Sequence, residues 1–216
     1  MPKRHQLLAD MQGEDRHAAL LVAQVGAMPT EIQLIIQTAR YEEAIKGLHP
    51  IRSYIIRVVG AIEHRISNLG MTTTELAWVD DHPLLWQYTQ APAALFFRGQ
   101  PDDAHALALE LAQAHASTFR GWRHFPEYFS LDKPLYELLV SGGGLLGQMP
   151  QALAEACAPI LERHGLETKV LFGRSHTDQA QGPLKHQKLQ TLLIGESYFI
   201  SYTFSVEEMV ARPGSG

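Results

Sequence analysis

Apolar residues follow a helical spacing through the first third of the chain. Up to residue 70 they recur three and four positions apart, as in a helix that buries one face. The pattern predicts three helices, over about residues 6–25, 30–48 and 50–69. Proline is tolerated in a first turn, which is the place of Pro50 in the third helix. The stripe of that helix consists of Ile51, Tyr54, Ile55, Val58, Ile62, Ile66 and Leu69.

Between residues 71 and 121 the pattern predicts two short strands followed by a helix. The strands cover residues 75–79 and 94–97, and a loop with Pro83 and Pro92 joins them into a hairpin. Asp102 or Asp103 is expected to cap a helix that reaches about Gly121, because aspartate accepts hydrogen bonds from free N–H groups. The core stripe of this helix is Ala104, Leu107, Ala108, Leu111, His115 and Phe119.

In the last 80 residues, segments with helical spacing and segments with strand alternation follow one another. A short element over 135–140 precedes a glycine run, a helix over 150–164 is closed by Gly165, and a strand covers 167–172. The polar stretch 173–188 is longer than most connections in compact domains. Two further strands cover residues 189–194 and 198–206, and a turn over 195–197 separates them. The last one alternates, which is typical of a half-buried antiparallel strand with one apolar face, formed by Tyr198, Ile200, Tyr202, Phe204 and Val206.

Helices come first and strands gather later, and this order favours an α+β fold. We expect a helical N-terminal part followed by a mixed body with a small antiparallel sheet of about four or five strands. Residues 1–70 form the helical segment, 71–210 the α+β body and 211–216 a flexible tail. Isolated helices rarely bury their apolar faces alone. The helical segment should therefore dock on the body or serve as a dimerisation element.

Composition places the chain among ordinary globular proteins. It has 216 residues, of which 45% are hydrophobic and 19% charged, so a sizeable core can form without metal or disulfide. A single cysteine, Cys157, excludes an intramolecular disulfide and fits a reducing compartment. No apolar run approaches the roughly 18 residues of a membrane span, and the N-terminus lacks a signal-peptide pattern. We therefore expect a cytoplasmic protein without membrane contact.

Charge argues against nucleic acid as the main partner. The formal net charge is −5, and lysines and arginines are scattered singly along the chain. Nucleic-acid binding depends on basic patches that displace phosphate counterions. A folded chain can still gather distant arginines on one face, so a nucleic-acid-binding regulator stays as the third hypothesis.

Two polar or glycine-rich patterns were weighed as sites and favour structural roles. Gly142, Gly144 and Gly147 match G-x-G-x-x-G, but the predicted helix begins only after the motif, unlike in a dinucleotide site. A glycine hinge between two closely packed helices fits better. Two acidic clusters with histidine, 80–82 and 102–105, flank the predicted hairpin and favour caps and turns over a metal centre. We predict no metal site and identify no cofactor.

Aromatic and basic residues alternate in segment 119–129, the strongest candidate for a binding site. Such a mixture can stack on a ligand or hold an anion, and it can equally cover the core. His115 lies on the apolar stripe just before it, where a histidine is either a core residue or a functional group. The candidate ligand-binding residues are Trp78, Trp86, His115, Phe119, Trp122, Arg123 and Tyr128.

The favoured function is a non-enzymatic regulatory or sensor-like module that binds a small molecule or a protein partner, as a homodimer. No G-x-S-x-G elbow occurs, and Cys157 lies on the inward face of its helix. The alternative is a small enzyme that uses His and Asp in a pocket beside segment 119–129. The polar stretch 173–188 could then close over a substrate, although its composition favours a solvated loop. Whether the chain has catalytic activity is left open.

Overall fold

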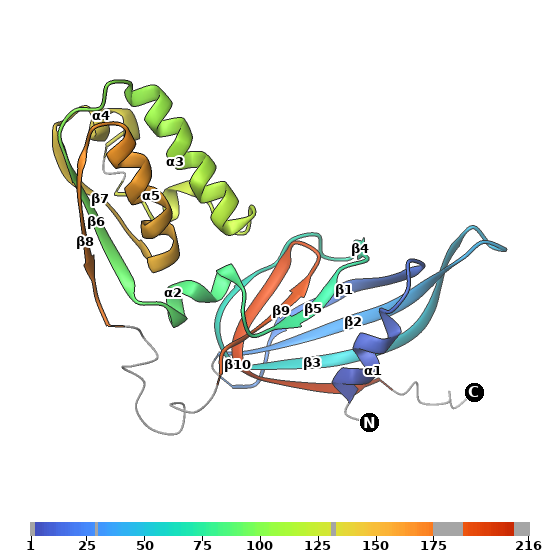
Figure 1. The fold of residues 1–216 in the computed structure, drawn as a ribbon. Helices are drawn as coiled ribbons and strands as arrows, with labels where there is room; N and C mark the ends of the chain where they lie inside the picture. The colour runs from blue at the N-terminus through green and yellow to red at the C-terminus, as the bar shows by residue number, and fades with distance from the viewer. Residues whose placement is uncertain (1–2, 29, 131–132, 175–187, 210–216) are drawn as a thin grey trace, which may run out of the picture. The chain divides into compact units, whose positions relative to one another are not determined.

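The chain folds into two compact units, each with its own sheet (Figure 1). The computed structural model describes residues 3–28, 30–130, 133–174 and 188–209. Unit 1 comprises residues 1–81 and 186–216, and unit 2 comprises residues 82–185. The predicted α+β class is confirmed. The boundary expected near residue 70 falls inside unit 1.

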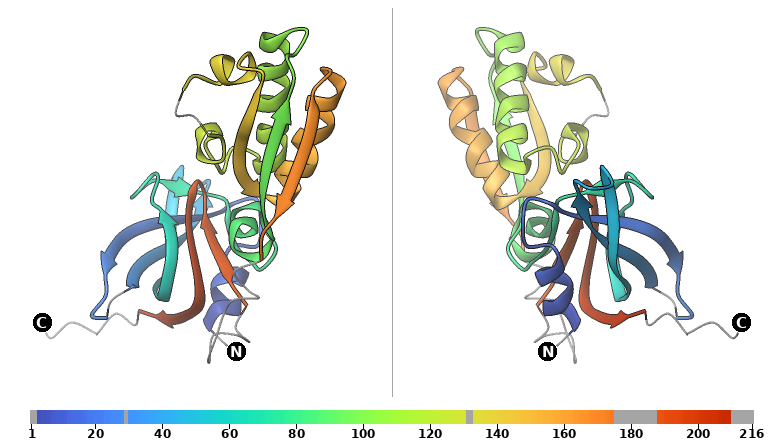
Figure 2. Two further views of the ribbon diagram at one scale, coloured as in Figure 1. Left: turned by 90° about the vertical axis from the view of Figure 1, so that its left-hand side faces the viewer. Right: turned by 90° about the vertical axis from the view of Figure 1, so that its right-hand side faces the viewer.

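Unit 1 is built on a seven-stranded antiparallel sheet that curves into a half-barrel (Figures 1 and 2). Its strand order is β4-β1-β2-β3-β10-β9-β5. The strands are β1 (Arg16–Val25), β2 (Glu31–Glu42), β3 (Gly47–Arg65), β4 (Thr72–Thr73), β5 (Leu76–Val79), β9 (Gln190–Ile194) and β10 (Ser197–Glu208).

Among the described residues, the N-terminal part of unit 1 contains one short helix, α1 (Lys3–Asp10). Its Leu7 packs into the core of this sheet. Leu7 is fully buried with Leu34, Ile56 and Phe199 in the same apolar cluster. Each of these three residues comes from a different strand. Burial of one such side chain contributes roughly 1.5–3 kcal/mol. The helix thus fills the apolar side of the sheet.

Asp10 ties the end of α1 to two strands. Its carboxylate accepts a hydrogen bond of 2.6 Å from the Tyr54 hydroxyl and one of 3.3 Å from the Thr38 hydroxyl. It also forms an ion pair with Arg52. A buried carboxylate requires such partners, because desolvation without them is costly. Burial, together with the Asp10 hydrogen bond, raises the pKa of Tyr54, which stays a donor. The cluster fixes where α1 ends.

The three helices predicted over residues 6–25, 30–48 and 50–69 are wrong, apart from the short α1. These segments form β1, β2 and β3, in which alternate residues such as Ile32, Leu34 and Ile36 are buried. The predicted stripe of the third helix mixed both faces of a strand: Tyr54 and Val58 are buried, whereas Ile55 points the other way. Isoleucine and valine on both faces satisfied helical spacing and strand alternation at once.

Unit 2 contains a three-stranded antiparallel sheet of order β7-β6-β8 and two long helices. Its strands are β6 (Pro92–Arg98), β7 (Gly143–Pro150) and β8 (Glu167–Phe172), and its long helices are α3 (Ala104–Phe119) and α5 (Gln151–Arg163). Shorter elements are η1 (Pro83–Leu85), α2 (Trp86–Thr89), η2 (Phe125–Glu127) and α4 (Leu135–Leu139). The predicted sheet of four or five strands is therefore replaced by two sheets, of seven and three strands.

Local sequence rules hold well in unit 2. Asp103 caps α3 by accepting from the N–H groups of His105 and Ala106, as expected. Gly165 follows the end of α5 with a positive φ of 78°, and β8 has the predicted bounds. Within α3 the buried stripe is Ala104, Leu107, Leu111, His115 and Phe119.

The predicted hairpin over residues 75–97 is wrong, although both of its strands exist. β5 pairs with β9 in unit 1, whereas β6 pairs with β7 and β8 in unit 2. The connection between them holds η1 and α2. A hairpin needs its two strands to be each other's partners, and here each strand finds partners far along the chain.

The glycine run is a strand rather than a hinge between helices. β7 begins at Gly143, and its Gly147 lies under the crossing backbone of residues 128–130. A Cβ on Gly147 would lie 2.0 Å from the carbonyl oxygen of Tyr128. Only glycine allows this approach.

The last strand, β10, alternates in only part of its length. Its first five residues are all buried, and a bulge between Ile200 and Ser201 shifts the register. Phe199 lies in the core cluster, against which Phe204 and Val206 also pack. The predicted alternation holds over residues 202–206 and is wrong over 198–201, where consecutive side chains are buried, because a strand covered on both faces does not alternate. Residues 175–187 of the polar stretch and the predicted tail 211–216 lie outside the described residues.

Replacement of Gly147 tests the crossing over β7. We expect Gly147→Ala to lower the free energy of unfolding by about 3 kcal/mol or more, because the backbone must move. Gly47→Ala is the control, since its Cβ would meet nothing closer than 3.7 Å. It should change stability by less than about 0.5 kcal/mol. Denaturant titration monitored by circular dichroism measures both, and equal effects would contradict the crossing.

Candidate binding surface

Six of the seven predicted site residues belong to unit 2, and four of them pack together near the end of α3. Phe119 is fully buried at the centre of this group. Its ring centroid lies 4.9 Å from that of His115, 5.0 Å from Tyr128 and 6.2 Å from Trp86. Aromatic pairs at such separations stabilise a core beyond their area of burial.

The other two predicted site residues of unit 2, Trp122 and Arg123, contact residues 82–90. The Arg123 guanidinium donates to the Leu84 carbonyl at 3.2 Å and lies 3.5 Å from Glu127. Trp122 packs edge-on against His82, with ring centroids 5.4 Å apart. The Tyr128 hydroxyl donates to Gln87 at 3.2 Å. Segment 119–129 therefore packs against η1 and α2 in this structure, and its ligand-binding role stays a prediction.

Trp78 lies in unit 1, on β5. Its ring meets Phe204 edge-on, with centroids 5.5 Å apart, and the Arg4 guanidinium lies 4.7 Å from its centroid. A cation over an indole face is a favourable contact, so Trp78 has its own packing partners in unit 1.

His115 is a buried histidine in an aromatic environment. It is only 3% exposed, and the rings of Phe119, Phe125, Tyr128 and Phe129 surround it. Its Nε2 has no hydrogen-bond partner among the described residues. Burial lowers the pKa of His115. The charge of Glu127 raises this pKa, and the charge of His124 lowers it further. A neutral imidazole is the form that this environment favours.

Other reactive side chains have structural surroundings. Burial raises the pKa of the Cys157 thiol to about 12, which keeps it protonated. The ring of His82 accepts from the Leu84 N–H and caps η1. Asp103 caps α3. In the part of the chain that the structure describes, no three His, Cys, Asp or Glu residues are grouped so as to hold a metal ion.

The three-stranded sheet of unit 2 has two very different faces. Ala93, Leu95 and Phe97 of β6 are buried under the helices, in one cluster with residues of α3 and α5. Figure 2 shows both helices on this one side of the sheet. The residues between them, Ala94 and Phe96, point to the other side. Within the described residues of unit 2, no helix covers that side.

We call this second side the open face. Strand pairing places Leu171 beside Ala94, Lys169 beside Phe96 and Glu167 beside Arg98. A depression of about 520 Å³ lies here, lined by Phe96, Phe97, Arg98, Glu167, Thr168, Lys169 and Leu171. The open face thus combines an aromatic and an aliphatic side chain with two cations and one carboxylate.

Among the described residues, β8 also forms an edge of the sheet, since the strand order is β7-β6-β8. The Gly173 N–H donates to the Pro92 carbonyl at 2.7 Å, so residue 173 points its backbone toward β6. In an antiparallel pair this direction alternates along the strand. Thr168, Val170 and Phe172 therefore direct their N–H and C=O groups away from β6. Phe172 is also 55% exposed.

Reasoning from the sequence missed this surface, because it sought aromatic residues near one another along the chain. One signal was present. The strand over 167–172 ends in Val170-Leu171-Phe172, three consecutive apolar residues. A strand with one solvated face should alternate. The run therefore indicates apolar groups on both faces.

The comparisons with known proteins add no family to this description. No protein-family model, curated protein or solved structure matches the chain. Within the described residues, no helix combines the length and apolar character needed to cross a membrane. Function must therefore be argued from the surface itself.

The pH dependence of stability tests the environment of His115. The pKa of His115 is lower in the folded state than the usual 6.5, so acid protonates the unfolded state first. Stability should fall as the pH drops below about 6.5, by at most about 1.4 kcal/mol per pH unit from this group. In His115→Leu this part of the slope should disappear, as measured by denaturant titration from about pH 8 to 5.5. Parallel curves would contradict this environment, because they would show that the pKa of His115 is the same in the folded and unfolded states.

Proposed function

We propose that the chain is a non-enzymatic binding module that takes an extended segment of a protein partner on unit 2. The segment lies along β8 and reaches onto the open face. One observation carries this proposal: a sheet face with the half-buried Phe96 and the exposed Leu171 adjoins an edge strand whose backbone groups point outward. Addition of a strand to such an edge is a recurrent way of binding peptides.

Backbone pairing would supply much of the affinity. The outward groups of Thr168, Val170 and Phe172 offer donors and acceptors in the spacing of a strand. Proteins commonly protect exposed edges with prolines, bulges or inward-pointing charges. β8 contains no proline and no bulge, and its Lys169 lies on the open face. The edge is therefore accessible to a partner.

Side chains on the open face would select the partner. Phe96 and Leu171 favour an apolar residue of the bound segment. Arg98 and Lys169 favour an acidic one, because the depression holds two cations and a single carboxylate. Few cations and one aromatic ring are a poor match to nucleic acid, which needs several phosphate contacts. A protein segment with apolar and acidic residues fits the surface better.

The enzyme hypothesis has less support. It required histidine and aspartate in a pocket beside segment 119–129. His115 is instead surrounded by four aromatic rings, and Asp103 and His82 cap helical elements. A general base needs a substrate within hydrogen-bond reach. The described surroundings of His115 favour packing.

A matched pair of substitutions at Val170 tests strand addition. Val170→Pro removes an outward N–H but no hydrogen bond to β6, and an edge strand tolerates proline at such a position. Val170→Ala removes side-chain packing and keeps the N–H. Linear peptides are first selected from a random display library on the full-length protein. We expect a selected peptide to bind Val170→Ala nearly as tightly as the wild type, and Val170→Pro at least about tenfold more weakly.

The open face is tested with the same selected peptide by fluorescence polarisation. Phe96→Ala should weaken binding, and Leu109→Ala should not, because Leu109 is an exposed residue of α3, on the opposite side of the sheet. Circular dichroism confirms that each variant is folded. Equal binding by both proline and alanine variants at position 170, with no effect of Phe96→Ala, would contradict the proposal.

A further inference from the structure

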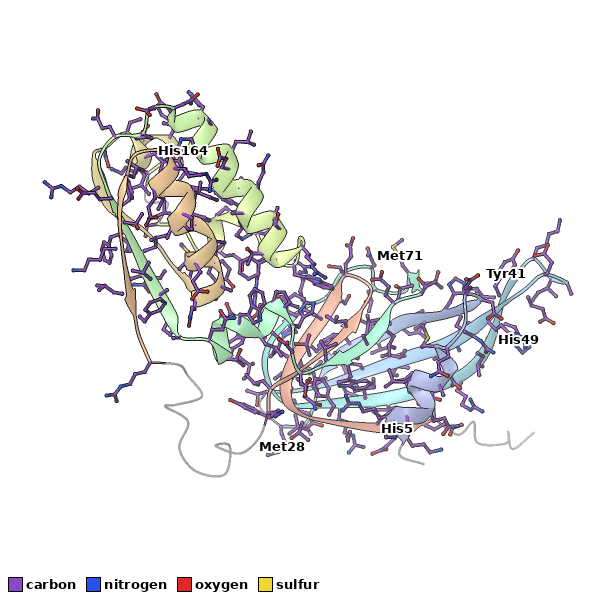
Figure 3. The ribbon with its side chains drawn as sticks, in the orientation of Figure 1. His5, Met28, Tyr41, His49, Met71 and His164 are labelled. Atoms are coloured by element: carbon purple, nitrogen blue, oxygen red, sulfur yellow. The ribbon has the colours of Figure 1, made fainter. Side chains whose placement is uncertain are left out.

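Unit 1 carries a protruding hairpin that the proposed function leaves unused. β2 and β3 pair beyond the point where their neighbours end: β1 pairs with β2 only as far as Arg40, and β10 pairs with β3 only as far as Tyr54. We call residues 41–48 the arm. Figure 1 shows the arm extending past the other strands, and Figure 3 shows Tyr41 and His49 in this part of the hairpin.

The arm exposes apolar side chains. Tyr41 is 41% exposed, Ile45 60% and Leu48 37%. Tyr41 and Leu48 are cross-strand partners, and Ile45 lies in the turn between their strands. A single exposed apolar residue requires no explanation, but several on one projecting hairpin are typical of a contact surface.

The charges of the arm complement those of the open face. The arm carries Glu42, Glu43 and Lys46, and the open face carries Arg98, Lys169 and Glu167. The arm thus has two carboxylates and one ammonium group, and the open face has the reverse balance. Among the described residues, none of these six side chains forms an ion pair. Complementary charge is what selects one partner surface over another.

We propose that the arm of one copy of this chain binds the open face of a second copy. This inference rests on the proposed function, because it names the protein segment that the open face takes. Tyr41 and Ile45 would cover Phe96 and Leu171, and the two glutamates would meet Arg98 and Lys169. Lys46 would meet Glu167. Each copy carries one arm and one open face, so every copy can take either role in this contact.

A charge exchange on the full-length chain tests the contact. The arm variant is Glu42→Lys with Glu43→Lys, and the face variant is Arg98→Glu with Lys169→Glu. Sedimentation velocity over a concentration series should show that the wild type self-associates. Each variant alone should associate at least about tenfold more weakly, because like charges then face each other. Mixed together, the two variants should form a heterodimer, because each arm again meets an open face of opposite charge.

The control carries the same charge change elsewhere. Glu75→Lys with Glu137→Lys alters two exposed glutamates outside the arm and the open face. This variant should self-associate like the wild type. Added salt should weaken association of the wild type and of the mixed pair alike, since exposed charges are screened.

Two outcomes would overturn the inference: a wild type that stays monomeric at every concentration, or charge-exchanged variants that do not recognise each other. Failure of the proposed function is a separate result. If selected peptides bind in a Val170- and Phe96-dependent manner while the chain is monomeric, the open face takes a segment of another protein and the arm does not. If no such peptide binds, and association is insensitive to Phe96→Ala, both proposals fail.

Discussion

The packing of α3 and α5 on one face of a three-stranded sheet is the constraint on which the candidate surface depends. Strand side chains alternate between the two faces, so burial of Ala93, Leu95 and Phe97 under the helices forces Ala94 and Phe96 outward. Because β6 is the central strand, Phe96 also lies between its neighbours rather than at a rim. The aromatic centre of the open face is thus a direct consequence of how the core of unit 2 is filled.

The same core explains the fate of the aromatic segment. Phe119, Tyr128 and His115 combine large apolar rings with few polar atoms, and burial of such rings is strongly favourable. The Tyr128 hydroxyl is held by its hydrogen bond to Gln87, and the His115 ring is held by the aromatic rings around it. Residues that could have formed a reactive centre are used for packing and for helix caps. What remains accessible is a surface defined by shape, backbone and charge, which suits recognition of a protein segment.

Unit 1 contributes the arm, which results from the length of β2 and β3. β3 has 19 residues, of which β10 pairs with residues 54–65, and β2 has 12 residues, of which β1 pairs with residues 32–40. Asp10 fixes α1 against Thr38, Arg52 and Tyr54, near the point where β3 leaves β10. β1 still pairs with β2 as far as Arg40, and beyond Arg40 the strands β2 and β3 pair with each other as the arm. An arm with apolar and acidic residues and an open face with apolar and basic ones are thereby present in one chain.

Local patterns were sufficient to predict several elements of unit 2. Asp103 and the stripe from Ala104 to Phe119 defined α3, Gly165 marked the end of α5, and 167–172 was correctly assigned as a strand. These features depend on neighbours within one or two turns, so the printed residues contain the necessary information. The α+β class was predicted correctly, but partly from helices over residues 6–69, most of which form the strands β1, β2 and β3 instead.

The remaining features depend on strand pairing and on packing between distant parts of the chain. Residues 1–70 were assigned to helices because Ile, Val and Leu on both faces of β1, β2 and β3 also satisfy helical spacing. Strand pairing over long distances resolves this ambiguity: Tyr198 of β10 pairs with Arg65 of β3, and local spacing contains no trace of such a partner. The candidate surface was missed for the same reason. The outward direction of the Val170 backbone groups depends on which strand lies beside β8, and the place of Phe96 on the open face depends on which face the helices pack. Both are set by contacts between residues far apart in the chain.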